Sequence, residues 1–296
     1  MGPMTPAPGT TSIRKLDSVT FDTLLKEQDP FGSTACRFDL TGVELITPCG
    51  LVQLAAACYA LSSEGRRPII VVNEDSVRTY LMRSGFVAVV EPVAQFTPPI
   101  PRIVSHFYDH LRGSNPMLIE VTRIQTGAEL SELLDRIVSV LRHRLKYRKY
   151  DAFDIATGIS EICQNTFDHN AHTCGFVAMQ VYGRGMKRFL EIGVADYGDG
   201  LATTLRRNPK NGAVASDYDA IRLATELGTS EHDDPTRGTG LYHLLEIAYK
   251  HEGSVQIRSG AAKVRYRMDK KQGWGFRVPG MPGVQIALTL PTKAAA

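Results

Sequence analysis

Apolar and polar positions alternate along the first third of the chain, and their spacing predicts short strands separated by helices. Four apolar runs are short enough for buried strands, at residues 35–40, 43–47, 69–72 and 86–90. Residues 49–61 instead carry a continuous apolar face, which predicts a core helix. This alternation indicates an α/β domain over residues 14–92.

The ends of the predicted helices carry local signals. Pro48 is suited to the first turn of its helix, where the missing N–H of proline costs nothing. Asp75 or Ser76 is expected to cap the next helix, and Gly85 is expected to end it in a left-handed conformation.

A run of prolines separates this domain from the rest of the chain, and residues 93–116 are predicted as a linker with a short helix at 106–111. Beyond it, helices are expected at 129–145, 152–170, 220–227 and 241–251, and strands at 117–121, 176–182, 189–196, 254–259, 262–268 and 284–290. Residues 117–292 would then form a two-layer α/β sandwich with the helices on one side of the sheet. The expected fold class is α/β followed by α+β.

Composition sets limits on this picture. The chain has 296 residues, of which 43% are hydrophobic and 22% charged, as is usual for a globular protein. A net charge of +3 is too small to indicate a nucleic-acid or membrane partner by itself. No apolar run reaches the ~18 residues that span a bilayer, and residues 1–13 are predicted as a flexible tail without signal-peptide features. Five cysteines without C-x-x-C spacing favour a reduced, cytoplasmic protein.

Three polar residues follow one edge of the helix predicted at 152–170. Glu161, Asn165 and His169 are spaced four apart, so they form a stripe beside the apolar face. A carboxylate, an amide and an imidazole in that arrangement are suited to lining a pocket. The same pattern is also typical of a solvated helix surface.

Two glycine-rich segments come later in the chain. Residues 196–200, DYGDG, end an apolar strand, and their glycines would let a ligand approach the backbone; a plain turn is the alternative. Residues 237–241, RGTGL, precede a predicted helix, and the free N–H groups at a helix start bind phosphate well.

In this order, the Glu-x-x-x-Asn helix, the strand-end Asp-x-Gly-x-Gly, a polar segment and the Gly-x-Gly-Leu helix start closely resemble the GHKL ATPase superfamily. That superfamily includes histidine kinases, anti-sigma serine kinases, gyrase and the ninety-kilodalton chaperones. The resemblance covers about residues 117–292 and is closest to the anti-sigma serine kinases.

The resemblance implies a role for each motif residue. Glu161 would act as the general base or water-orienting group, and Asn165 would coordinate Mg²⁺. Asp196 would accept a hydrogen bond from the adenine amino group and so select ATP over GTP. The other residues implied to contact the nucleotide are His169, Gly198, Gly200, Arg237, Gly238, Thr239, Gly240 and Leu241, and residues 201–237 would form the ATP lid.

The first domain resembles a STAS domain, the fold of anti-sigma-factor antagonists, on residues 38–51, FDLTGVELITPCGL. In that family the helix-start loop reads Asp-Ser-Ser-Gly-Leu, and its first Ser is phosphorylated. Here Thr47, Pro48 and Cys49 replace Asp-Ser-Ser, so the acceptor position has no hydroxyl. We expect Thr47 to cap the helix and the loop to dock a partner rather than to accept phosphate. A generic α/β domain is the alternative.

The resemblance leaves two main function classes. The first is an enzyme that hydrolyses ATP or transfers its γ-phosphate to Ser or Thr of a partner protein. It would not be a classical histidine autokinase, because His143 lacks the acidic neighbour of a phosphoacceptor box. The alternative is a non-catalytic switch in which ATP orders the lid and thereby changes a partner surface. A partner protein is expected through the STAS-like domain or the lid, a homodimer is left open, and no membrane partner is expected.

Three weaker signals remain. The basic segment 142–149, with Tyr147 and Tyr150 interleaved, allows a nucleic-acid-associated regulator as a third class, but such runs are more often solvated helix ends. His169, His172, Cys163 and Cys174 are close in sequence but match no tetrahedral zinc spacing. Residues 273–276, GWGF, are expected as a partner-contact hairpin or a loop before the last strand.

Overall fold

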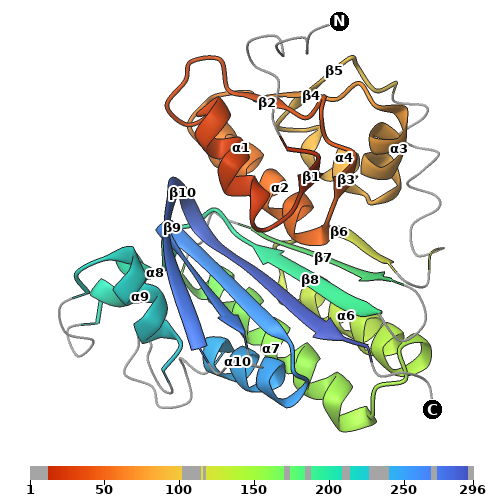
Figure 1. Ribbon diagram of the computed structural model, residues 1–296, viewed down its shortest axis with the longest axis vertical. Helices are drawn as coiled ribbons and strands as arrows, with labels where there is room; N and C mark the ends of the chain where they lie inside the picture. The colour runs from red at the N-terminus through yellow and green to blue at the C-terminus, as the bar shows by residue number, and fades with distance from the viewer. Residues whose placement is uncertain are drawn as a thin grey trace, which may run out of the picture.

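The computed structural model describes residues 13–101, 115, 118–169, 174–183, 188–208, 214–226, 240–267 and 272–292, with the side chains of 165–169 and 272 left aside. These residues form a mixed α/β protein, as the sequence predicts, with a five-stranded sheet as its largest element. Helices of the second half cover one face of that sheet, and the first half covers the other face (Figure 1).

The first half contains two small parallel sheets and four helices within the described residues. One sheet pairs β1 with β3, and the other has the order β2-β4-β5. In chain order the elements are β1 (Lys15–Leu16), α1 (Thr20–Gln28), β2 (Arg37–Asp39), β3 (Leu45–Ile46), α2 (Pro48–Ser63), β4 (Ile69–Val71), α3 (Asp75–Arg83), α4 (Phe86–Val90) and β5 (Gln95–Thr97).

Helix α2 is the centre of this half. Pro48 is its first residue, and the Thr47 hydroxyl accepts a hydrogen bond from the Gly50 N–H at 3.4 Å, so the expected cap is confirmed. Its residues from Pro48 to Leu61 are all buried, because it packs both on the first-half core and on the large sheet.

The strand predicted at residues 86–90 is wrong, since these residues form the short helix α4. Gly85 has φ 72°, which confirms its expected left-handed conformation and turns the chain directly from α3 into α4. A five-residue apolar run in which four residues are buried carries no periodicity that separates helix from strand. Glu74, rather than Asp75 or Ser76, is the N-cap of α3 and makes no side-chain cap bond.

The third strand of the parallel sheet is β5, which lies inside the segment predicted as a linker. It pairs in parallel with β4 through Ile69–Gln95, Ile70–Phe96 and Val71–Thr97. The prolines that follow end the strand instead of excluding it. The helix predicted at residues 106–111 lies outside the described residues.

The large sheet has the order β6-β7-β8-β10-β9, and each neighbouring pair is antiparallel. Its strands are β6 (Leu118–Ile124), β7 (Gly175–Tyr182), β8 (Phe189–Ala195), β9 (Ser254–Arg267) and β10 (Gln272–Pro291). The helices of this half are α6 (Gly127–Ser139), the π-helix η1 (Val140–Arg144), α7 (Lys149–His169), α8 (Gly200–Arg206), α9 (Asp217–Ala224) and α10 (Gly240–Lys250).

Several boundaries differ from the prediction. The two strands expected at 254–259 and 262–268 are one strand, β9, which continues through Gly260. Residues 273–276 belong to β10 and pair with β9, rather than forming a loop before the last strand. Helix α8 occupies the start of the segment predicted as irregular, and the helix predicted at 129–145 ends in a π-helix.

Two hydrophobic cores lie on the two faces of the large sheet. The core on the helical side joins α6, α7 and α10 to the strands through residues such as Ile159, Leu244 and Ile286. The other core contains first-half residues together with Phe176, Ala178 and Ala195 of the sheet, so it combines both halves of the chain. Among the described residues, no helix has the length and apolar character needed to cross a membrane.

Candidate functional site

Asp196 follows the last residue of β8 and is fixed in place by the backbone around it. Its own N–H donates to the Val284 carbonyl at 2.9 Å. Its Oδ1 accepts from the N–H groups of Gly198 at 2.8 Å and Val284 at 3.3 Å. The bond from Gly198 closes a turn typical of Asp two residues before a glycine. Within the described residues both bonds reach Oδ1, and Oδ2 accepts none.

Two glycines let neighbouring segments approach this turn. Gly283 on β10 has φ 81°, and a Cβ there would lie 2.2 Å from the carbonyl oxygen of Asp196 and 2.7 Å from its Oδ1. Gly200 has φ 76°, and its Cβ would lie 3.0 Å from the Ser259 hydroxyl, which accepts from the N–H of Leu201 at 2.9 Å. Gly200, implied by the family resemblance to contact nucleotide, is thus also required by the local backbone.

The electrostatics of Asp196 follow from this setting. Burial raises the pKa of its carboxyl from 3.8 to about 6, although the N–H groups of Gly198 and Val284 favour the charged form. Burial and then the charge of Asp196 raise the pKa of the Cys163 thiol on α7 to about 12. Cys163 lies on α7, so this helix passes near the end of β8, and Glu161 lies two residues earlier on another side of the same helix.

Glu161 lies against the start of α10. Its two carboxylate oxygens are each 3.2 Å from Nδ1 of His243. A Cβ on Gly240 would lie 3.0 Å from Cβ of Glu161 and 3.4 Å from its Oε2, so the absence of a side chain at Gly240 brings this helix start beside the carboxylate. Three residues earlier on α7, Gly158 allows Ile247 the same close approach.

His243 is the site residue that sequence reasoning missed. It stands three residues after Gly240, on the side of α10 that faces α7, and the signal for it is that spacing from the Gly-x-Gly segment. It also lines a cavity of about 530 Å³ between α7 and α10, together with Asp154, Thr157, Glu246, Ile247, Tyr249 and Lys250.

The other predicted site residues divide into two groups. Gly198 is buried within the turn after β8, and Leu241 is buried in the core under α10. Asn165 and His169 lie on the last turns of α7, but their side chains are outside the described part. Arg237, Gly238 and Thr239 lie outside the described residues, as do 209–213 and 227–236 of the expected lid, whose described parts are the helices α8 and α9.

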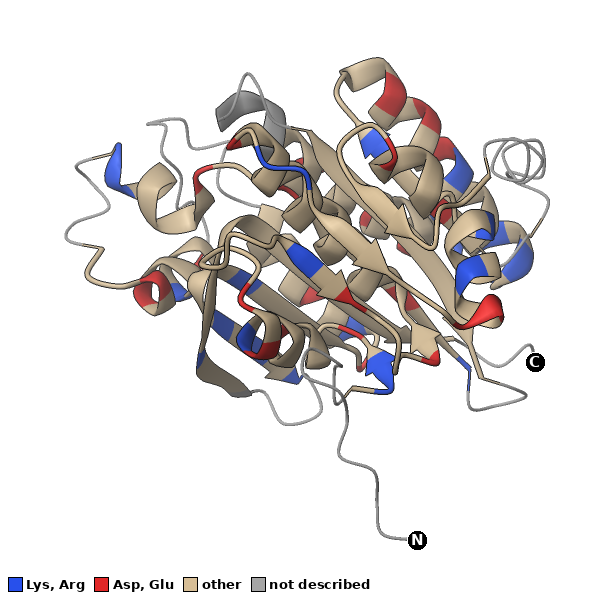
Figure 2. Ribbon diagram, turned by 90° about the horizontal axis from the view of Figure 1, so that it is seen from above, with Lys and Arg blue, Asp and Glu red and all other residues tan. Residues whose placement is uncertain are grey.

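The weaker signals have separate outcomes. No three His, Cys, Asp or Glu side chains gather as metal ligands in the described part of the chain, which does not include His172. Tyr147 is buried in the helical-side core and donates to the Pro291 carbonyl at 3.1 Å, whereas Tyr150 is exposed. Only one of the two aromatic residues in the basic segment is therefore free to stack on a base. Lys and Arg lie interspersed with Asp and Glu over the ribbon (Figure 2).

The loop that resembles a STAS phosphorylation site is buried against the second half of the same chain. Thr47 is 2% and Cys49 is 1% exposed. The N–H of Cys49 donates to Oε1 of Glu191 on β8 at 3.1 Å, and a Cβ on Gly193 would lie 2.8 Å from Cα of Cys49. In this conformation the loop contacts β8, so it is not open to another protein.

The arrangement combines a strand-end carboxylate with one open oxygen, a carboxylate–imidazole pair, and a helix start that a glycine brings close. It is suited to recognising a hydrogen-bond donor at one end and to holding a proton at the other. No protein-family model matches the chain, and no curated protein matches its sequence.

Proposed function

We propose that this chain binds Mg-ATP between α7, the end of β8 and the start of α10, and that it hydrolyses ATP or transfers the γ-phosphate to a Ser or Thr hydroxyl of a partner protein. The observation that carries the proposal is the setting of Asp196: Oδ1 is held by two backbone N–H groups, and Oδ2 accepts no bond from the described residues. The motif order that resembles GHKL ATPases supports the choice of nucleotide.

Asp196 suits an adenine ring on chemical grounds. An ionised carboxylate oxygen only accepts hydrogen bonds, and adenine presents an amino group where guanine presents a carbonyl. Because a carboxylate facing a carbonyl is repelled, the same residue would reject GTP. With a pKa of about 6 the carboxyl is mostly ionised at neutral pH, as this role requires. Gly198 and Gly200 would allow the ring to lie against the backbone.

The phosphate end would be served by the start of α10. Gly240 is its first residue, and helix-start N–H groups bind anions. Gly238, Thr239 and Arg237 precede it directly in sequence and would add two N–H groups and a cation. Asn165 offers an amide oxygen, a donor that suits Mg²⁺; when bound, the ion would neutralise charge on the phosphates.

Glu161 is assigned the proton chemistry. It would accept the proton of the attacking water or hydroxyl, and His243 Nδ1, 3.2 Å from both carboxylate oxygens, would hold the carboxylate in one orientation. The cavity beside His243 offers room next to this pair for part of a second molecule. The reaction class is phosphoryl transfer, in which positioning contributes most of the rate.

Calorimetry with Asp196→Ala tests the binding step. A hydrogen bond to a charged group is worth ~1.5–3 kcal/mol, so ATP should bind about 10–150-fold more weakly while GTP changes far less. Asp199→Ala is the matched control, because Asp199 is exposed and its carboxylate pairs with Arg207 outside the turn. Equal ATP affinity in Asp196→Ala and the unchanged protein would refute the assignment.

Turnover with Glu161→Gln separates the enzyme from the switch. The variant should keep ATP affinity and lose roughly 10²–10⁴ of the rate of phosphate release or transfer, the usual contribution of a positioned base. If the unchanged protein binds ATP selectively but shows no turnover alone or with cell extract, ATP acts as a switch ligand. The observation favouring that second function is a buried connection between Asp196 and the first half of the chain, described next.

A further inference from the structure

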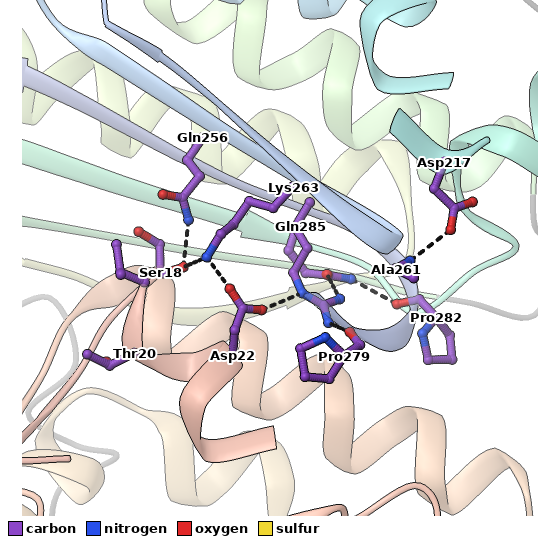
Figure 3. A network of polar contacts seen from close by, with 12 residues as sticks. Ser18, Thr20, Asp22, Asp217, Gln256, Ala261, Lys263, Pro279, Pro282 and Gln285 are labelled. Carbon is purple, nitrogen blue, oxygen red and sulfur yellow. Dashed lines mark hydrogen bonds and ion pairs between the residues drawn. The ribbon is translucent and has the colours of Figure 1, made fainter. Parts of the chain in front are cut away.

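Asp196 is connected to helix α1 of the first half by a series of buried polar contacts. Figure 3 shows the part of this series between Asp22 and Gln285. Asp22 on α1 accepts from Nε of Arg258 on β9 at 3.0 Å. Nη1 of Arg258 donates to Oε1 of Gln285 on β10 at 3.0 Å. Nε2 of Gln285 donates to the carbonyl of Asp196 at 3.2 Å and to that of Pro282 at 2.8 Å.

The side chains that form this series of contacts are buried, so water does not compete for their hydrogen bonds. The side chain of Arg258 is 0% exposed, Gln285 is 1% exposed and Asp22 is 9% exposed. The other Asp22 oxygen, Oδ2, pairs with Lys263. The Ser18 carbonyl of the same N-terminal segment accepts from Lys263 at 3.2 Å and from Gln256 at 2.5 Å.

Charge makes Asp22 the key member of the network. Arg258 and Lys263 are two buried cations, and the carboxylate that pairs with both comes from α1. Burial lowers the pKa of Arg258, while the charge of Asp22 opposes that change. If the Asp22 carboxylate were removed while α1 stayed in place, both cations would remain buried without this anion, which is strongly unfavourable. The position of Arg258 therefore depends on α1.

Arg258 in turn fixes the orientation of Gln285. The guanidinium has donors only, so it selects the oxygen end of the Gln285 amide. The amide nitrogen must then point at the carbonyls of Asp196 and Pro282. Pro282 precedes Gly283 and Val284 on β10, and the Asp196 carbonyl lies against Gly283. The Val284 N–H is one of the two groups that hold Oδ1 of Asp196. Gln285 thus holds both chain segments that define the direction of the carboxylate.

We propose that Arg258 and Gln285 are positioning residues for Asp196, and that the contact of α1 with β9 thereby sets the ATP affinity and base selectivity of the site. This inference rests on the proposed function. It links the first half of the chain to the nucleotide, and linkage is reciprocal: bound ATP strengthens the α1 contact by the factor that the contact adds to ATP affinity.

Gln285→Glu removes the hydrogen bonds that Gln285 donates to the carbonyls of Asp196 and Pro282 and keeps an acceptor for Arg258. The replacement has the same shape and keeps an oxygen for Arg258, but it places a second oxygen against the carbonyls of Asp196 and Pro282. We expect ATP to bind about five- to tenfold more weakly, the effect of losing about one neutral hydrogen bond. GTP binding should change less than twofold, so the ATP/GTP selectivity falls in parallel.

Gln256→Glu is the matched control. Gln256 is also a buried glutamine that donates its amide N–H to a carbonyl of the other half, but that carbonyl belongs to Ser18 and not to the Asp196 turn. It should leave the ATP/GTP selectivity within twofold of the original. Arg258→Lys is a second test, because one ammonium cannot reproduce the fork that joins Asp22 to Gln285; it should also lower selectivity.

Hydrogen exchange without nucleotide gives a readout that does not depend on ATP. In Gln285→Glu the amides of Gly198 and Val284 should exchange faster, and in Gln256→Glu they should not. Unchanged exchange there, or unchanged ATP/GTP selectivity in both Gln285→Glu and Arg258→Lys, would overturn the positioning role. If the unchanged protein binds no ATP, the proposed function fails, and the site-affinity part of this inference fails with it. Faster exchange in Gln285→Glu would still establish that Gln285 holds the turn.

Discussion

Two of the contacts between the first half and the large sheet, named here the α2 seam and the α1 seam, differ in character. Along the α2 seam, Gly193 of β8 lets the backbone of Cys49 and the side chain of Val52 come within the space of a methyl group, and Glu191 is the charged side chain at the contact. Along the α1 seam, Asp22 meets Arg258 and Lys263. Apolar packing supplies stabilisation with little directionality, whereas the charged seam admits few arrangements of its donors and acceptors. We infer from this difference that the α2 contact mainly stabilises the association of the two halves, and that the α1 contact fixes their relative position.

The largest expected effect comes from the charged seam. Asp22→Ala leaves Arg258 and Lys263 buried without their shared carboxylate, and removing one member of a buried pair costs about 3–5 kcal/mol. Urea denaturation should show that loss. Thr23→Ala, an exposed position on the same helix, should stay within about 0.5 kcal/mol. A loss below about 1 kcal/mol for Asp22→Ala would mean that the two seams do not differ as described.

At the α2 seam we expect a smaller loss of stability, caused by a smaller change, the addition of one methyl group. The added methyl group of Gly193→Ala would lie 2.8 Å from Cα of Cys49 and 2.9 Å from Cγ2 of Val52, and overpacking of this kind costs about 1–3 kcal/mol. Gly280→Ala is the control, since a Cβ there meets nothing within 4 Å. In Gly193→Ala, Cys49 should also react faster with an alkylating reagent, as measured by mass spectrometry. Unaltered labelling together with unaltered stability would contradict the close contact.

The smallest effect is a pH dependence of the α2 seam. Burial raises the pKa of Glu191 above its usual 4.5, although hydrogen bonds from Thr47 and the Cys49 N–H oppose the shift. The folded state therefore holds this proton more tightly than the unfolded state, and the stability of the protein falls as the pH rises from about 4.5 through the raised pKa. Glu191→Gln cannot lose the proton, so it should gain stability relative to the original between pH 4.5 and pH 7. A stability difference that stays constant with pH would exclude this reading.

The sequence predicted the long periodic elements and failed where burial comes from distant segments. Helices α2, α7 and α10 and strands β7 and β8 follow from patterns that one face of each element explains. The segment 86–90 was misread because a short and mostly buried apolar run carries no periodicity, and α8 was missed because Gly200 also fits a turn.

The polar network was hidden for a related reason. Gln256 and Arg258 alternate with Val255 and Ile257 along β9, a pattern that normally marks a solvent-facing side. Here that side is covered by α1, whose own signal is Asp22 among the apolar residues Phe21, Leu24 and Leu25. The contact between a charged residue on an apolar helix face and a charged residue on a distant strand cannot be predicted from the two separate patterns.

The Asp196 site was predicted in parts. Residue types and order pointed to Glu161, Asp196 and Gly240, and the structure brings Glu161 and Gly240 together. His243 has no motif of its own, since a histidine within an amphipathic helix is ordinarily a surface residue. Gln285 and Arg258 were out of reach for the same reason as the network, because their role is visible only once α1, β9 and β10 lie side by side (Figure 3).

The partners of each contact are far apart in sequence, and this separation sets the order in which the fold can be completed during synthesis. Asp22 and Arg258 are 236 residues apart, and Ser18 and Lys263 are 245 residues apart. At a translation rate of about 5–20 residues per second, α1 leaves the ribosome roughly 10–50 seconds before β9, and the apolar helix α2 leaves it roughly 7–28 seconds before β8, whose Glu191 lies 142 residues after Cys49. During that interval the surface of α2 that later packs on β8 is exposed in a nascent chain. We expect ribosome-associated chaperones to occupy it, and a ribosome stalled before β8 to yield a chain that aggregates through this helix.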